Sequence, residues 1–145
     1  MKDETTTRLE NILQSVDNMD DAETSAEEHG KHYGFFYEYL NEYIANHNVE
    51  IPQLIIKSGV SKNYIYNILN GDTKNPGRDK VIATCIGAGM NLTELNRALK
   101  ISGHNSLYPK NERDIFIAAL VNQGIGDVTR VNIELHAKGI KILDV

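Results

Sequence analysis

The stretch Ile51–Gly71, with the sequence IPQLIIKSGVSKNYIYNILNG, determines how the rest of the chain is organised. Its apolar residues recur at helical spacing on both sides of Gly59-Val60-Ser61. Because glycine adopts a left-handed backbone conformation without steric cost, the chain can turn sharply at Gly59. Ser61 can then accept a hydrogen bond from a free amide of the following helix. The pattern predicts two short helices joined by a tight turn.

The second predicted helix, residues 62–70, has an apolar inward face and a polar outward face. The inward residues are Ile65, Ile68 and Leu69. The outward face offers one positive charge, amides and a phenol, carried by Lys62, Asn63, Tyr66, Asn67 and Asn70. Such groups suit hydrogen bonding to phosphates and to base edges.

This stretch resembles the helix-turn-helix of the Cro/phage-repressor (XRE) family of DNA-binding domains. The resemblance runs from about residue 35 to about residue 99. Its matching residues are Leu54, Gly59, Val60, Ser61, Ile65 and Ile68, followed by Asn70-Gly71 and Pro76. Ile55 departs from the family pattern, where a small alanine is usual, and Ile51 stands where a phosphate-touching glutamine is common. The resemblance implies an all-α, lambda-repressor-like domain of five helices.

The resemblance also implies roles for individual residues. Ser61 is expected to cap the recognition helix and to touch a phosphate, and the base-reading residues are Lys62, Asn63, Tyr66 and Asn67. Asn63 and Asn67 can each pair bidentately with adenine. The loop after the helix lies along the DNA backbone in this family, which adds the phosphate candidates Asn70, Lys74, Asn75 and Arg78. For Lys74 and Arg78, a solvated surface charge is the competing interpretation.

Length and composition limit the other possibilities. The chain has 145 residues, 41% of them hydrophobic and 24% charged, which indicates one soluble globular domain. No apolar run approaches the roughly 20 residues of a membrane span, and the polar start MKDETTTRLE has no signal-peptide core. A single cysteine, Cys85, excludes an intramolecular disulfide and a zinc-ligand set, so we expect a cytoplasmic protein. The scattered histidines predict neither an enzyme nor a cofactor.

The net charge of −5 is unevenly distributed. Residues 1–32 carry nine acids and three bases, whereas residues 33–145 carry eleven acids and twelve bases. Within residues 51–80 there are five bases and two acids, a net charge of +3. Local charge decides phosphate binding, because salt screens fields beyond about 8–10 Å. The acidic excess therefore does not argue against a DNA-binding surface.

The N-terminal region, residues 1–33, divides into two parts. Leu9, Ile12, Leu13 and Val16 form one helical stripe, which predicts a short amphipathic helix over residues 5–18. The acidic, polar residues 18–31 are typical of a flexible linker. The stripe is either a frayed extension or a docking element for a protein partner or second subunit, and the linker can also compete with DNA for the basic face. His29 and His32 lack a third ligand, so no metal site is expected.

The first helix of the predicted domain, residues 35–46, is rich in aromatic residues. Its large side chains recur at spacings of three and four, which favours core packing over a base-stacking platform. The predicted core residues are Phe36, Tyr39, Leu40, Tyr43 and Ile44.

An internal repeat occupies the second half of the chain. Residues 92–107 match residues 128–143 at an offset of 36, with identities at Thr93/Thr129, Asn96/Asn132, Leu99/Leu135, Gly103/Gly139 and Leu107/Leu143. Upstream, Arg78-Asp79…Gly89 echoes Arg113-Asp114…Gly124 at an offset of 35. Each copy is predicted to be a helix, a glycine turn and a second helix, and Asn91 and Asp127 are N-cap candidates. Repeated helix pairs usually bury a shared apolar face, here Ile115, Ile117, Leu120, Val121, Val131 and Leu135.

These observations predict three regions: an acidic N-terminal helix and linker (1–33), a repressor-like domain (34–103) and a C-terminal helix pair (104–145) that repeats 78–103. The pair either extends the same core or dimerises, and residues 139–143 either cap the core or pair with a neighbour. The expected function is sequence-specific regulation of transcription by a homodimer bound to double-stranded DNA. The alternative is a protein-interaction adaptor or antitoxin-like subunit that keeps the helix-turn-helix.

Overall fold

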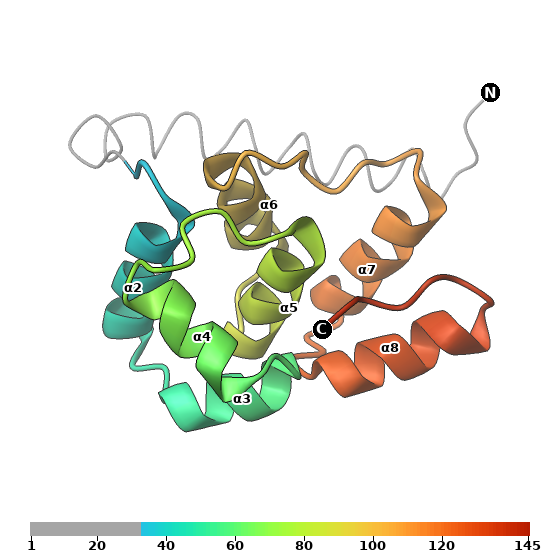
Figure 1. The fold of residues 1–145 in the computed structure, drawn as a ribbon. Coiled ribbons are helices and arrows are strands. Elements are labelled where there is room, and N and C mark those ends of the chain that lie inside the picture. Colours follow the sequence, from blue (N-terminus) through green and yellow to red (C-terminus); the bar gives the residue numbers. More distant parts are fainter. Residues whose placement is uncertain (1–32) are drawn as a thin grey trace.

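The computed structural model describes residues 33–145, and these contain seven α-helices and no strand (Figure 1). The predicted helix at 5–18, the acidic linker and the histidines at 29 and 32 lie outside the described residues. The helices are α2 (Phe36–His47), α3 (Ile51–Ser58), α4 (Lys62–Leu69), α5 (Arg78–Ala88), α6 (Leu92–Ile101), α7 (Glu112–Asn122) and α8 (Val128–Ala137). The all-α prediction is confirmed for this part of the chain.

Helix α2 supplies the aromatic wall of the core. Phe36, Tyr39, Leu40 and Tyr43 are buried, as predicted, and Ile44 is partly buried against the same core. The helix begins and ends one residue later than expected and is closed by Asn48, which takes the left-handed conformation. The core-packing interpretation of this cluster is therefore confirmed.

Helix α5 is the central element, because every residue from Val81 to Ala88 is buried. It packs against α3, α6 and α8 (Figure 1). Its closest approach is to α3 at Gly87, where an added Cβ would lie 2.7 Å from the amide nitrogen of Ser58 and 2.9 Å from the carbonyl oxygen of Leu54. Only glycine leaves room for the α3 backbone at this crossing.

The two copies of the repeat are the helix pairs α5–α6 and α7–α8. Their predicted caps are confirmed: Asn91 forms a capping box with Glu94, and the Asp127 carboxylate accepts from the amide of Thr129 at 2.9 Å. Gly103 and Gly139 both take positive φ, 80° and 69°, because the chain reverses after each second helix.

The C-terminal pair packs on the same core as the rest of the described chain. Of the predicted shared apolar face, all residues but Ile115 are buried, namely Ile117, Leu120, Val121, Val131 and Leu135. Ile115 is partly buried. In the tail, Leu143 is 1% exposed and Ile140 is partly buried against the core, so these two residues of the segment 139–143 cap the core in the single chain.

Candidate nucleic-acid interface

The helix-turn-helix is formed by α3, a three-residue turn and α4. Gly59 has φ of +69°, the left-handed conformation expected for a sharp turn. The buried hydroxyl of Ser58 donates to the carbonyl of Ile55 and accepts from the amide of Val60, both at 3.1 Å. Ser61 accepts from the amide of Tyr64 at 3.2 Å, which confirms its role as the N-cap of α4. These bonds fix the direction in which α4 leaves the turn.

The outward face of α4 is the candidate base-reading surface. Ile65 and Ile68 are fully buried. The five residues predicted to face outward are all exposed: Lys62, Asn63, Tyr66, Asn67 and Asn70. Within residues 33–145, the side chains of the first four have no hydrogen bond or ion pair, so their donors and acceptors are available to an external partner.

Helix α2 holds the far end of α4 in place. The Asn41 amide donates to the carbonyl of Leu69 at 2.8 Å and so closes one of the free carbonyls at the end of α4. One turn earlier on α2, the Tyr37 ring lies 3.4 Å from where a Cβ on Gly71 would stand. Together they set the angle of α4 and the start of the following loop.

The loop after α4 places its polar residues at the surface. The side-chain oxygen of Asn70 accepts a hydrogen bond from the backbone amide of Asp72 at 3.0 Å. The side-chain NH₂ group of Asn70 is therefore free to donate. Lys74 is exposed, with its ammonium 5.4 Å from the ring centroid of Phe35, and Asn75 is exposed. A ring nitrogen of His104 lies 2.9 Å from the carbonyl oxygen of Pro76 and anchors the end of the loop.

Arg78 has a different position from the one that a phosphate contact requires. Its Nη1 and Nη2 donate to the two carboxylate oxygens of Asp114 at 3.1 and 2.9 Å. Its Nε and Nη2 also donate to the carbonyls of Asn105 and Ser106. Because its guanidinium is bound to these partners within the fold, Arg78 joins the two helix pairs and is not a phosphate-contacting residue of the candidate interface.

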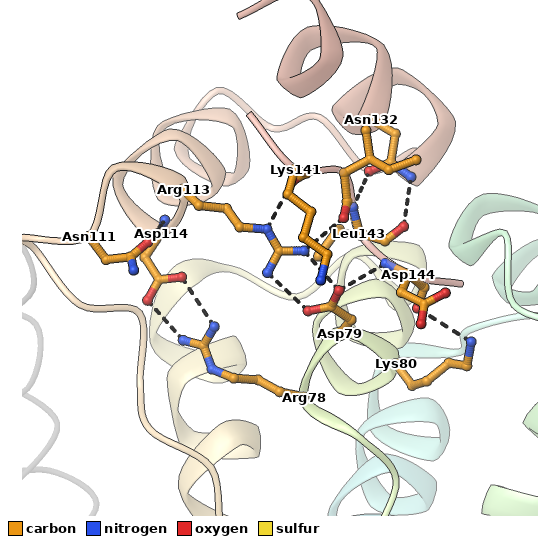
Figure 2. A network of polar contacts seen from close by, with 11 residues as sticks. Arg78, Asp79, Lys80, Asn111, Arg113, Asp114, Asn132, Lys141, Leu143 and Asp144 are labelled. Atoms are coloured by element: carbon orange, nitrogen blue, oxygen red, sulfur yellow. Dashed lines mark hydrogen bonds and ion pairs between the residues drawn. The ribbon is translucent and has the colours of Figure 1, made fainter. Parts of the chain in front are cut away.

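The same arrangement occurs a second time, with the roles of the two helix pairs exchanged (Figure 2). Arg113 donates from Nη1 and Nη2 to the carboxylate of Asp79 at 3.0 and 2.8 Å. The amide of Asp144 donates to Asp79 at 2.9 Å, just as the amide of Tyr108 donates to Asp114 at 2.9 Å. We call these four side chains, Arg78, Asp79, Arg113 and Asp114, the reciprocal clamp.

Burial alone would raise the pKa of Asp79. The hydrogen bonds from Arg113 and from the amide of Asp144, together with the charge of Arg113, outweigh the effect of burial and hold the pKa of Asp79 below its ordinary value.

Cys85 on α5 is fully buried, and burial raises the pKa of its thiol. Cys85 is therefore a core residue.

The net basic charge near α4 is smaller than the sequence count of +3, because Lys80 is bound within the fold. The reciprocal clamp takes one base and one acid of residues 51–80, Arg78 and Asp79, and so leaves the net charge unchanged. Lys57, Lys62 and Lys74 remain exposed around α4 and its loop, with Asp72 as the exposed acid. Lys80 is occupied: its ammonium donates to the main-chain oxygens of Asp144 and Val145 at 3.3 and 2.9 Å. The local net charge available to a ligand is about +2 by this count.

The described residues contain no group of three or more His, Cys, Asp or Glu side chains able to hold a metal ion. In the same part of the chain, no helix combines the length and apolarity that crossing a membrane requires. No protein-family model, curated protein or solved structure matches the chain.

Two features of this region were missed by sequence reasoning. Tyr37 and Asn41 lie four residues apart on α2, a second stripe that the aromatic core pattern conceals. The sequence shows that the Arg-Asp pair recurs at an offset of 35. It does not indicate that each arginine pairs with the aspartate of the other copy.

Proposed function

We propose that the protein is a sequence-specific DNA-binding regulator of transcription with a lambda-repressor-like domain, which inserts α4 into the major groove and acts as a homodimer. The observation that carries the proposal is the outward face of α4. It presents two asparagines one helical turn apart, flanked by Lys62 and Tyr66, and none of these four side chains has a hydrogen-bond partner among residues 33–145. An exposed, unpaired amide pair at this spacing suits the edges of neighbouring bases.

Phosphate contacts come from the two ends of α4 in this proposal. Ser61 and the first amides of the helix lie at one end, where the helix dipole favours an anion. Asn70, Lys74 and Asn75 lie at the other end and in the loop, and all three are exposed. The N-terminal segment at 5–18 remains a candidate docking element for a protein partner.

The test is binding of the purified protein to mixed genomic DNA fragments across a salt series. Asn63→Ala/Asn67→Ala should lose selectivity among fragments but keep a similar salt slope, because amides read bases and do not release counterions. Lys74→Ala should weaken all fragments alike and reduce the salt slope by about 1. Asn122→Ala, an exposed asparagine at the end of α7, is the matched control. Absence of binding even at low salt would refute the proposal.

A protein-interaction adaptor or antitoxin-like subunit is the second candidate. It is favoured by large apolar side chains exposed on helices other than α4, Ile56 on α3 (69% exposed) and Ile133 on α8 (61% exposed). If Ile56→Ser and Ile133→Ser abolish association with a protein partner while the α4 variants have no phenotype, this second function holds.

A further inference from the structure

The first helix pair is a unit that includes its own extended tail. The Nε and Nη2 of Arg78 donate to the carbonyls of Asn105 and Ser106 at 3.2 and 3.4 Å. The side-chain oxygen of Asn96 accepts from the amide of Leu107 at 2.9 Å. Residues 105–107 are thus tied to α5 and α6.

The second helix pair repeats this construction at equivalent positions. Arg113 donates to the carbonyls of Lys141 and Ile142 at 3.0 and 2.9 Å. The side-chain oxygen of Asn132 accepts from the amide of Leu143 at 2.8 Å. Residues 141–143 are therefore tied to α7 and α8, and each unit closes on itself.

The contact between the two units has the pattern of a homodimer. Each unit gives its arginine to the aspartate of the other through the reciprocal clamp (Figure 2). Helix α5 lies against α8 just as α7 lies against α6. Reciprocal contacts of this kind define an isologous interface, the kind that two copies of one molecule make.

A short exposed turn joins the two units. Tyr108 follows the tail of the first unit, and the side chain of Asn111 already caps α7. Within the turn there is one backbone hydrogen bond, from the amide of Asn111 to the carbonyl of Tyr108 at 3.0 Å. The amide of Tyr108 also donates to Asp114, a contact that exchange would make between chains. Tyr108 is 55% exposed and Lys110 is exposed, so little packing holds the turn closed. Straightened, four residues span about 13 Å.

We propose that two copies of the chain exchange their α7–α8 units, so that the unit of each copy occupies the place on α3, α5 and α6 of the other. The exchanged dimer keeps every contact of the reciprocal clamp, because only the turn at residues 108–111 changes conformation. Exchange of an identical element is a low-cost route to a dimer for this reason. The proposal specifies the interface of the homodimer proposed above, but its test requires no DNA, so the two can fail separately.

The test uses two variants that each place like charges in the clamp. Asp79→Arg sets two arginines against each other within one chain, and Arg113→Asp sets two aspartates against each other. Consider an exchanged dimer with one chain of each variant. In one interface, the arginine introduced at position 79 of one chain meets the aspartate introduced at position 113 of the other. In the second interface, the native Asp79 meets the native Arg113. After joint refolding, native mass spectrometry should show mixed dimers in roughly tenfold excess over either like dimer, a difference of about 1.4 kcal/mol.

The double variant Asp79→Arg/Arg113→Asp in one chain is the matched control, because it restores opposite charges without exchange. If the double variant melts above both single variants and the mixture still contains only single chains, the exchange does not occur. If the double variant melts no higher than the single variants, a mixing experiment with wild-type chains decides whether exchange occurs. Isotopically heavy and light chains refolded together must give mixed dimers, and separately prepared dimers must stay unmixed for hours; single chains or rapid mixing overturn the proposal.

Discussion

Asp114→Asn is the most informative single substitution, because it changes one charge and almost no volume. Asp114 is the most buried carboxylate of the reciprocal clamp, with its side chain 6% exposed. Its carboxylate accepts three hydrogen bonds, two from Arg78 and one from the amide of Tyr108. Asparagine keeps one acceptor oxygen but turns an NH₂ group toward the Arg78 guanidinium. The substitution therefore leaves a partly buried arginine without its counter-charge.

The expected loss of stability follows from the burial of both partners. Removing one member of a fully buried ion pair destabilises by about 3–5 kcal/mol. The Arg78 side chain is 26% exposed, so water can solvate part of the released charge. We therefore expect a loss of about 2–3 kcal/mol in the free energy of unfolding, and a fall in Tm of about 10 °C.

The assay is urea unfolding followed by circular dichroism at pH 7, with wild type, Asp114→Asn and Asp72→Asn compared at equal protein concentration. Asp72 is exposed in the loop after α4, so its variant should stay within about 0.5 kcal/mol of wild type. The equal concentration matters, because the proposed exchange between chains would make the measured stability depend on protein concentration. An Asp114→Asn variant as stable as Asp72→Asn would show that the clamp contributes nothing to folding.

Three further predictions concern packing, pH and thiol reactivity. Gly87→Ala should destabilise the protein by about 1–3 kcal/mol because its methyl group meets the α3 backbone. In the same urea titration, Gly126→Ala should change stability little, because its added Cβ would lie 3.7 Å from the carbonyl oxygen of Ile86, an ordinary van der Waals contact. Because the pKa of Asp79 is lowered in the folded state, its carboxylate stabilises the fold above the ordinary carboxyl pKa of about 3.9, and this stabilisation is lost as the pH falls through the folded-state value. The Tm of Asp79→Asn should therefore fall less than the Tm of wild type between about pH 5 and 3. Parallel curves of Tm against pH would contradict this. Cys85, fully buried, should react with a thiol reagent only on the timescale of unfolding, and a fast reaction in native buffer would show that α5 is open.

The local features of the fold were predictable from sequence because each depends on a few neighbouring residues. The turn at Gly59, the cap at Ser61 and the capping box at Asn91 all follow from residue type and spacing, and all three are present. The outward face of α4 was predictable for the same reason, since its buried partners Ile65 and Ile68 mark the opposite side.

The arrangement of the helix pairs could not be predicted in this way. Helix α5 is buried on all sides, so its sequence has no amphipathic stripe to indicate which neighbour it meets. Arg78 looked like a loop cation because its partner, Asp114, lies 36 residues away and its own charge is the same in either setting. A residue at the first position of a helix is free to turn outward or inward, and only the tertiary packing decides between the two.

The symmetry of the helix pairs bears on how the proposed regulator would meet DNA. The two units of α5–α8 are related reciprocally, but α2, α3 and α4 accompany only the first of them (Figure 1). Within residues 33–145, the proposed base-reading face therefore occurs once. A DNA site with two-fold symmetry requires a second face from a second chain, held at a fixed distance. The proposed exchange of α7–α8 would supply that link through α8, which packs on α3 of the helix-turn-helix. The same contacts that close the single chain would then join the two proposed base-reading faces.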